Sequence, residues 1–252
     1  MKANTMKKFL LGTVALVALA APASAADLAA RPAYTKAPPP MISPVYDWSG
    51  FYIGINGGWG QTRDGRSGVL TGADFGCHDA NGGTAGGQIG YRWQSGAFVF
   101  GLEGQGNWAD FSGSNVNLAF PAITLRSKMD AFGLFTGQIG YAWNNALLYL
   151  KGGAAVTDVR YDSIINATGA LETSAGSNTN WGGTVGAGLE YGFAPNWSAA
   201  IEYDHIFHTS QSLTFTGAAG APIPDPRNVG GDTDLVTARI NWRFGGPVIA
   251  KY

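Results

Sequence analysis

Charged residues are scarce in this chain. Asp, Glu, Lys and Arg make up 13% of its 252 residues, about half of the roughly 25% that is usual in soluble globular proteins. A soluble protein with two-faced sheets needs charged side chains outside, so this scarcity indicates that much of the exterior does not meet water. The formal net charge is -1, which gives nucleic acid or any other strongly charged partner no basis for attraction.

Cysteine is nearly absent. The single cysteine, Cys77, excludes an intramolecular disulfide. It is followed by His78 and Asp79, residue types that ligate metals, but a metal site needs further ligands held in a defined geometry. We therefore predict neither a metal site nor a cofactor, and we interpret Cys77 as a thiol in a mobile loop.

The chain also lacks a long apolar run outside its N-terminus. Residues 9–21 are apolar, which is shorter than the about 20 residues that a membrane-spanning helix needs. Lys7 and Lys8 directly precede this run, and a small-x-small pattern ends at Ala25. Residues 1–25 are therefore predicted to be a secretory signal peptide of a bacterial exported protein, cleaved before Ala26. Translation begins either at the first methionine or at Met6.

A segment rich in alanine and proline follows at residues 26–47 and includes Pro38-Pro39-Pro40. Such a composition forms an extended tail and no core. We expect it to lie in the periplasm, either as a spacer or as a segment that binds peptidoglycan or another partner.

Glycine and repeated motifs are what the chain has in abundance. Its 38 glycines are about twice the usual share of roughly 7%. The motif GQIGYRW at residues 87–93 returns as GQIGYAW at residues 137–143, with looser echoes at 186–193 and 237–244. A period of about 50 residues with two long strands per unit predicts a repeated β-hairpin, whereas a propeller blade would need four short strands.

Large apolar and polar residues alternate over eight stretches, which predicts eight strands with two different faces. The predicted strands are residues 48–60, 84–93, 97–108, 128–143, 147–156, 181–193, 197–207 and 234–244. Short turns at 94–96, 144–145 and 194–196 alternate with polar loops at 61–83, 110–127, 157–180 and 208–233.

Short connections at one end and long ones at the other are typical of a transmembrane β-barrel. The strands are long enough to cross a bilayer when tilted, and a closed sheet leaves no unpaired backbone groups in lipid. We therefore predict an all-β fold at residues 48–244, a closed antiparallel meander of eight strands with short periplasmic turns and long extracellular loops. Residues 245–252 form a C-terminal tail.

The two faces of these strands carry different kinds of side chain, and each kind predicts a different role. Aromatic residues near the strand ends are expected to form two belts at the membrane surfaces. They are Trp59, Tyr91, Trp93, Trp108, Tyr141, Trp143, Trp181, Tyr191, Trp197, Trp242 and Phe244, together with Trp48 and Phe207. The opposite face carries charges of both signs, which should pair in an interior just wide enough for side chains. This predicted lumen charge network comprises Arg92, Glu103, Lys128, Asp130, Lys151, Glu190, Glu202, Asp204, Arg239 and Arg243.

Several motifs resemble the alphaproteobacterial outer-membrane immunogenic proteins, a porin-like eight-stranded β-barrel family (RopB-type). They are SAADL after the signal, YTKAPPP, the first strand WSGFYIGINGGWG, the GQIGYRW-type repeats and the ending VTARINWRF, and they cover essentially the whole chain. The resemblance implies an abundant, antigenic protein of the bacterial outer membrane, in contact with lipid and lipopolysaccharide, that supports envelope integrity. It also implies insertion by the barrel-assembly machinery, which reads a terminal strand ending in an aromatic residue. Ile240, Trp242 and Phe244 match that signal, unless Tyr252 replaces Phe244.

Three alternatives stay open at the level of sequence. One is a narrow porin-like channel for small solutes. Another is a lipid A-modifying enzyme: His208 and Ser210 share a face if extended, with Asp225 as the nearby carboxylate, whereas Asp204 and His205 are adjacent and point to opposite faces. The last is a soluble periplasmic barrel that turns its aromatic face inward around an apolar ligand.

Overall fold

A computed structural model of the chain describes residues 46–245. Their strands are β1 (Gly50–Gly68), β2 (Asp74–Ser95), β3 (Phe98–Val116), β4 (Ile123–Trp143), β5 (Ala146–Ile165), β6 (Leu171–Ala194), β7 (Trp197–His208), β8 (Gln211–Leu213), β9 (Thr216–Gly217) and β10 (Arg227–Arg243). The predicted signal peptide, nearly all of the periplasmic tail and Tyr252 lie outside the described residues, so their roles stay predictions.

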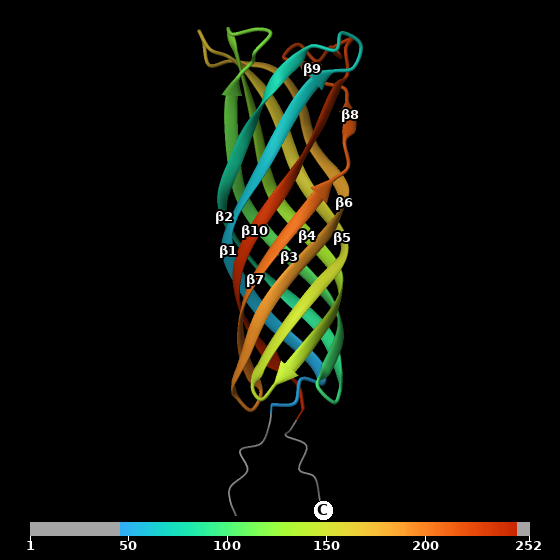
Figure 1. Cartoon of the computed structure of the whole chain (residues 1–252). Coiled ribbons are helices and arrows are strands. Elements are labelled where there is room, and N and C mark those ends of the chain that lie inside the picture. The colour runs from blue at the N-terminus through green and yellow to red at the C-terminus, as the bar shows by residue number, and fades with distance from the viewer. Residues whose placement is uncertain (1–45, 246–252) are drawn as a thin grey trace, which may run out of the picture. The chain divides into compact units, whose positions relative to one another are not determined.

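The sheet closes on itself. Each strand from β1 to β6 pairs with the next in antiparallel fashion, β7 pairs with β10, and β10 pairs with β1 (Figure 1). The closing seam is long, from Tyr52 opposite Arg243 to Gly68 opposite Arg227. The predicted eight-stranded antiparallel meander is therefore confirmed, with β8 and β9 as short additions inside the last connection. Among the described residues, no helix is long and apolar enough to cross a membrane.

Three tight turns connect the strands at one end of the barrel, where the sequence predicted them. They lie between β2 and β3, between β4 and β5, and between β6 and β7. Gly96 has φ +61° and Asn144 has φ +52°. Both are in the left-handed region that two-residue hairpin turns require, which explains a glycine and an asparagine at these positions.

At the other end the strands are longer than predicted. The segments 61–83, 110–127 and 157–180, expected to be polar loops, are mostly strand, and the connections shrink to residues 69–73, 117–122 and 166–170. The connection between β7 and β10 stays long and contains β8 and β9, which pair with β10 and β6. The sheet therefore continues well beyond the part that the alternating pattern identified.

Buried side chains of the barrel gather inside it, in two apolar clusters separated by polar residues. The larger cluster lies toward the long-connection end and contains Phe111, Met129, Phe132, Leu134, Ala155, Val159, Tyr161, Ile206, Phe215, Val229 and Leu235. The smaller cluster lies at the tight-turn end and contains Tyr46, Trp48, Val99, Leu147 and Tyr149. The polar residues between these clusters form the candidate site.

Candidate functional site

In the middle of the lumen, a tyrosine, a glycine and a glutamate lie side by side on three neighbouring strands. This arrangement, called a rung below, occurs twice. In the first rung, Tyr52 on β1 lies opposite Gly90 on β2, which lies opposite Glu103 on β3. The Tyr52 hydroxyl donates to Glu103 Oε2 at 2.6 Å. The ring crosses over Gly90 so closely that a Cβ there would lie 2.5 Å from the tyrosine Cζ, so only glycine fits under it. The same arrangement recurs on β5, β6 and β7 with Tyr149, Gly188 and Glu202, where the hydroxyl-to-carboxylate distance is also 2.6 Å.

Two cations join these rungs across the lumen. The Arg239 guanidinium donates to both Glu103 and Glu202. Lys151 Nζ lies 2.6 Å from Glu202 Oε1, 3.1 Å from Asp204 Oδ1 and 3.7 Å from Glu103 Oε1. The side chains of all five residues have no solvent exposure. Buried charges are tolerated only when paired and hydrogen-bonded, and here each cation is shared between carboxylates.

A second ion pair lies on the tight-turn side of this group. Arg92 Nη2 is 2.9 Å from Glu190 Oε2, and both side chains are buried. Asn241 donates to the other oxygen of Glu190 at 2.9 Å. The guanidinium also lies 4.5 Å from the centre of the Tyr52 ring, a cation–π contact that partly replaces lost hydration.

The residues before β1 close the barrel at the tight-turn end. Trp48 was predicted in an outer aromatic belt, but it is 2% exposed and lies inside with Tyr46. Its backbone N–H donates to Gln94 Oε1 at 2.9 Å. Arg243 contacts this segment through Asp47 at 3.6 Å, and its guanidinium lies 5.6 Å from the Tyr46 ring. Because Trp48 precedes the strand, strand alternation does not set its direction.

The prediction that Lys128 and Asp130 belong to the lumen charge network is wrong. They lie on the outer wall, where Lys128 Nζ contacts Asp110 at 3.2 Å and Asp130 at 3.4 Å, and Asp130 contacts Arg160 at 3.5 Å. The register of β4 shifts between Met129 and Ala131, leaving Asp130 without a partner on β5. One extra residue in a strand moves every following side chain to the other face. The other eight predicted network residues lie in the lumen.

Above the charged layer, amides and hydroxyls fill the lumen before the larger apolar cluster begins. Asn56 donates to Gln88 at 2.7 Å, and Asn107 donates to Asn56 at 2.6 Å. Gln88 in turn donates to Asn241 at 2.7 Å, which links this amide layer to the ion pairs. Polar groups at this depth are therefore satisfied mainly by one another, as buried polar groups must be.

A further polar chain lies within the extended part of the sheet. Asp64 Oδ2 accepts the Ser127 hydroxyl at 2.5 Å, and the same hydroxyl oxygen lies 2.7 Å from His78 Nε2. All three side chains are buried, and burial lowers the pKa of His78. The sequence patterns missed this chain because its residues lie in segments predicted to be loops.

The outer wall carries the aromatic residues that were predicted to form belts. At the tight-turn end, exposed side chains are Tyr91, Trp93, Tyr141, Trp143, Tyr191, Trp197, Trp242 and Phe244. Toward the long-connection end they are Trp59, Trp108, Trp181 and Phe207. Between them the wall is aliphatic, with Ile55 and Ile201 each 68% exposed. A wall of this kind is stable in lipid, and an aromatic face turned inward around a ligand is not what the structure has.

Residues 11–244 match the family of the outer membrane protein beta-barrel domain. The chain belongs to this family. It is 31% identical over 172 residues to a 22 kDa outer membrane protein of Rhizobium leguminosarum bv. viciae, covering 68% of this chain and 69% of that protein. It is 25% identical over 218 residues to a 25 kDa outer-membrane immunogenic protein of Brucella canis, covering 85% and 90%. The predicted resemblance and the outer-membrane location are therefore confirmed.

The fold of this outer-membrane barrel also resembles a solved structure. OprG from Pseudomonas aeruginosa superposes with a TM-score of 0.55 at 12% identity, covering 80% of this chain and 99% of that one. The tight turns and the extended strands lie at opposite ends of this barrel, and a bilayer between the two aromatic belts stays a prediction.

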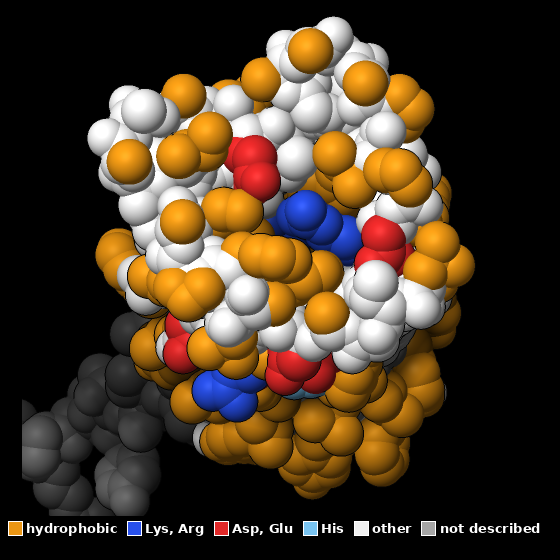
Figure 2. Space-filling model, turned by 90° about the horizontal axis from the view of Figure 1, so that it is seen from above, with side chains coloured by type: hydrophobic (Ala, Val, Ile, Leu, Met, Phe, Trp, Pro, Cys, Tyr) orange, Lys and Arg blue, Asp and Glu red, His pale blue; other side chains and the backbone are white. Residues whose placement is uncertain are grey.

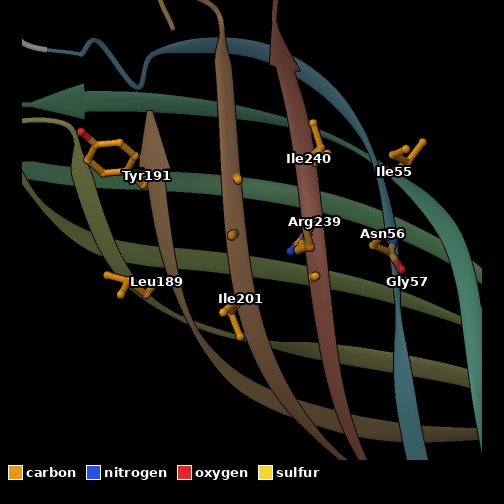
Figure 3. A pocket seen from close by; sticks show the side chains of 11 residues that line it. Ile55, Asn56, Gly57, Leu189, Tyr191, Ile201, Arg239 and Ile240 are labelled. Carbon is orange, nitrogen blue, oxygen red and sulfur yellow. The ribbon is translucent and has the colours of Figure 1, made fainter. Parts of the chain in front are cut away.

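The lipid-facing wall of the barrel is not smooth. A shallow apolar groove crosses β1, β10, β7 and β6, where the small residues Gly57, Ala238 and Ala199 lie between larger side chains. Figure 3 shows Ile55, Ile240 and Leu189 along this groove, while the Arg239 side chain points the other way, into the barrel. The groove opens on the outer wall and is lined mainly by apolar side chains.

The residues considered for catalysis and metal binding are engaged separately. His208 contacts Thr233 Oγ1 at 2.8 Å and Thr157 Oγ1 at 3.3 Å, whereas Asp225 accepts from Leu70 N and Thr71 Oγ1 on the extracellular connections. His205 lies on the outer wall, 2.8 Å from Asp234. Cys77 is exposed, His78 is buried beside Ser127, and Asp79 pairs with Arg63 at 3.2 Å. Successive side chains of β2 point to opposite faces, so these three neighbours do not converge.

Proposed function

We propose that this protein is a closed structural barrel of the outer membrane, which supports envelope integrity and presents a surface antigen, and that it conducts little or nothing. The observation that carries the proposal is the continuous filling of the lumen. Tyr46 and Trp48 close one end, the ion pairs around Arg239 fill the middle, and apolar side chains fill the extracellular part. A solute would have to displace buried charge pairs, each removal of a partner costing about 3–5 kcal/mol.

Conductance of the purified, refolded mature protein in planar lipid bilayers tests this directly. We expect no reproducible step above the detergent background at any voltage below membrane breakdown. A variant that truncates Tyr46 and Trp48 to Ala isolates the periplasmic closure and should also stay silent, because the apolar cluster above remains. Reproducible nanosiemens-scale steps from the wild-type barrel would favour the narrow channel.

We also propose that the barrel has no enzymatic role. The Asp64–Ser127–His78 chain contains the residue types of a hydrolase, but its carboxylate contacts the serine, whereas a triad needs it on the histidine. Ser127 is 1% exposed, which leaves a lipid or peptide no route to its hydroxyl. Mass spectrometry of lipid A from cells with and without the protein should show the same acyl chains, and a missing or added chain would revive the enzyme.

The expected partners of the protein correspond to the outer wall of the barrel, its last strand and the N-terminal tail. Lipid and lipopolysaccharide would contact the aromatic belts, and the barrel-assembly machinery would read Ile240, Trp242 and Phe244, which share the exposed face of β10 and the residue after it. Phe244→Ala should lower the fraction of heat-modifiable, membrane-inserted protein, while Phe193→Ala, an exposed aromatic on β6, should not. Peptidoglycan binding by residues 26–47 would be seen as co-sedimentation that a tail deletion abolishes.

A further inference from the structure

Two arginines point into the lumen at its extracellular mouth. Arg66 is on β1 and Arg227 is on β10, and these strands are paired, with Arg66 opposite Val229 and Gly68 opposite Arg227. Arg66 and Val229 are buried and Arg227 is half-buried, so the two guanidinium groups share the inner face of neighbouring strands. Seen from the extracellular end, basic side chains lie at the centre of the mouth, with acidic side chains beside them among apolar and neutral groups (Figure 2).

The pairing of these two arginines differs from that of the cations below. Arg92, Lys151, Arg239 and Arg243 each have a carboxylate oxygen within 4.0 Å. Within residues 46–245, neither Arg66 nor Arg227 has one. The lumen thus holds directly ion-paired cations in its middle, whereas the two arginines at its mouth have no direct ion pair among the described residues.

Their hydrogen bonds leave donors unused. Arg66 donates from Nη1 to the Asp162 carbonyl at 3.2 Å and from Nη2 to the Arg126 carbonyl, while its Nε is buried without a partner. In the described part of the chain, Arg227 makes one hydrogen bond, from Nη1 to Ser163 Oγ at 3.2 Å. A guanidinium has five N–H donors, so Arg227 retains most of its capacity.

Aromatic rings fix the orientation of both groups. The Phe215 ring lies between them, with its centre 6.0 Å from the Arg66 guanidinium carbon and 4.6 Å from that of Arg227. Phe75 lies 5.2 Å from Arg227, and Tyr161 lies 4.9 Å from Arg66. Burial lowers the pKa of Arg66 to about 10, which leaves it charged at neutral pH, and also lowers the pKa of Arg227. Arg227 is half-buried and makes one hydrogen bond among the described residues, so it keeps N–H donors for a ligand.

Four carboxylates act on this pair through space without forming a direct ion pair, Asp64 and Asp162 on Arg66 and Glu172 and Asp225 on Arg227. Asp64 accepts from Ser127, and Asp225 accepts from Leu70 N at 2.8 Å and from Thr71 Oγ1 at 2.8 Å. Glu172 acts on Arg227 through space but makes no ion pair with it in residues 46–245. A ligand anion would compete with these carboxylates for the two arginines, which points to moderate affinity.

We propose that the extracellular mouth of the barrel is a binding site for an oxyanion group, a phosphate, sulfate or carboxylate carried by an extracellular ligand. Arg227 is the direct contact, and Arg66 supplies a second positive charge beneath it. Arginine binds such groups through two parallel N–H donors, and these charge-assisted bonds are the strong ones. Because the mouth opens along the barrel axis, the site meets the medium, whereas the phosphates of lipopolysaccharide lie around the wall.

Isothermal titration of inorganic pyrophosphate into the refolded full-length mature barrel, in lipopolysaccharide-free detergent at constant ionic strength, tests the site. Arg227→Gln should weaken binding at least tenfold. Arg63→Gln is the matched control, because Arg63 is a cation of β1 on the outer wall with a 74% exposed side chain, and it should bind like the wild type. Heat-modifiable migration verifies that each variant is folded, which matters most for the buried Arg66→Gln.

Two results would overturn the proposal: a wild-type barrel that binds no more pyrophosphate than a sodium chloride blank shows, or equal losses from Arg227→Gln and Arg63→Gln. Adding lipopolysaccharide separates the sources of the anion. If lipopolysaccharide weakens pyrophosphate binding to the wild type but not to Arg227→Gln, lipopolysaccharide phosphate is a ligand of the site. If pyrophosphate binding to the wild type is unchanged by lipopolysaccharide, the site binds soluble anions.

Discussion

Arg239→Met is the substitution that most directly probes the filled lumen. Arg239 contacts Glu103 and Glu202, and its side chain has no solvent exposure. Without it, three buried carboxylates, those of Glu103, Glu202 and Asp204, would share the single ammonium of Lys151. The methionine fills much of the vacated volume, so the change isolates the loss of charge from the loss of packing.

The expected cost is large. Removing one partner of a buried ion pair typically costs about 3–5 kcal/mol, because the remaining charge is left without compensation. The two tyrosine hydroxyls, which donate to Glu103 and Glu202 at 2.6 Å, remain and hold the loss toward the lower end of that range. We therefore expect Arg239→Met to lower the free energy of unfolding by about 3 kcal/mol or more.

A triple variant, Arg239→Met with Glu103→Gln and Glu202→Gln, distinguishes charge from shape. It leaves Lys151 paired with Asp204 at 3.1 Å and removes the uncompensated carboxylates, so it should recover most of the lost stability, since neutral replacement of a buried network is often harmless. Urea unfolding in lipid vesicles, followed by tryptophan fluorescence and heat-modifiable migration, measures all three proteins. The reasoning is refuted if Arg239→Met stays within about 1 kcal/mol of the wild type, below the range for a broken buried pair.

Three other predictions concern the outer wall of the barrel, the close contact between Gly188 and Tyr149, and the buried His78. Leu150→Arg, at a 60% exposed position between the belts, should cost about 2–4 kcal/mol in vesicle unfolding, while Thr179→Arg, exposed beyond the upper belt, should cost little; equal costs would place the bilayer elsewhere. Gly188→Ala puts a Cβ 2.4 Å from the tyrosine over it and should cost about 1–3 kcal/mol by overpacking, whereas Gly104→Ala meets open space and should be neutral. His78 has a lowered folded pKa, so the unfolded chain takes up its proton first, and stability should fall as pH drops from about 6.5 toward that lower value; the pH dependence should shrink in His78→Gln, and an unchanged slope would contradict the assignment.

Much of the membrane part of the fold was predictable because lipid imposes one rule on every residue of a face. Ile53 and Trp242 point outward from paired strands, and both are exposed in the structure as the alternation requires. The same alternation places Tyr52 and Tyr149 on the inner face, where both are buried, but it does not show their roles. A hydrogen bond across a glycine joins three strands, and its partners are distant in sequence, so no local pattern contains it.

The error at Lys128 and Asp130 has a different physical origin. Counting by two from Phe135 assumes an unbroken strand, and the register shift next to Met129 breaks that count. A polar residue at such a position suits the outer face, because the wall there meets water while the lumen is lined by Met129 and Phe132. Bulges are common at barrel rims, but here the sequence offers no glycine or proline to mark one.

The strand segments that were predicted to be loops also have two different faces, but there the polar side chains point outward and the apolar side chains point inward. Within the membrane, β3 points Leu102 outward and Glu103 inward; farther along, it points Asp110 outward and Phe111 inward. The outer solvent changes from lipid to water along one strand, so the side chains that satisfy the wall change from apolar to polar. The interior then takes the apolar residues, which form a water-excluding core like that of a soluble protein. A pattern of outward apolar residues therefore ends at the upper belt, although the strands continue beyond it. The proposed anion site at the mouth lies in these further parts of the strands.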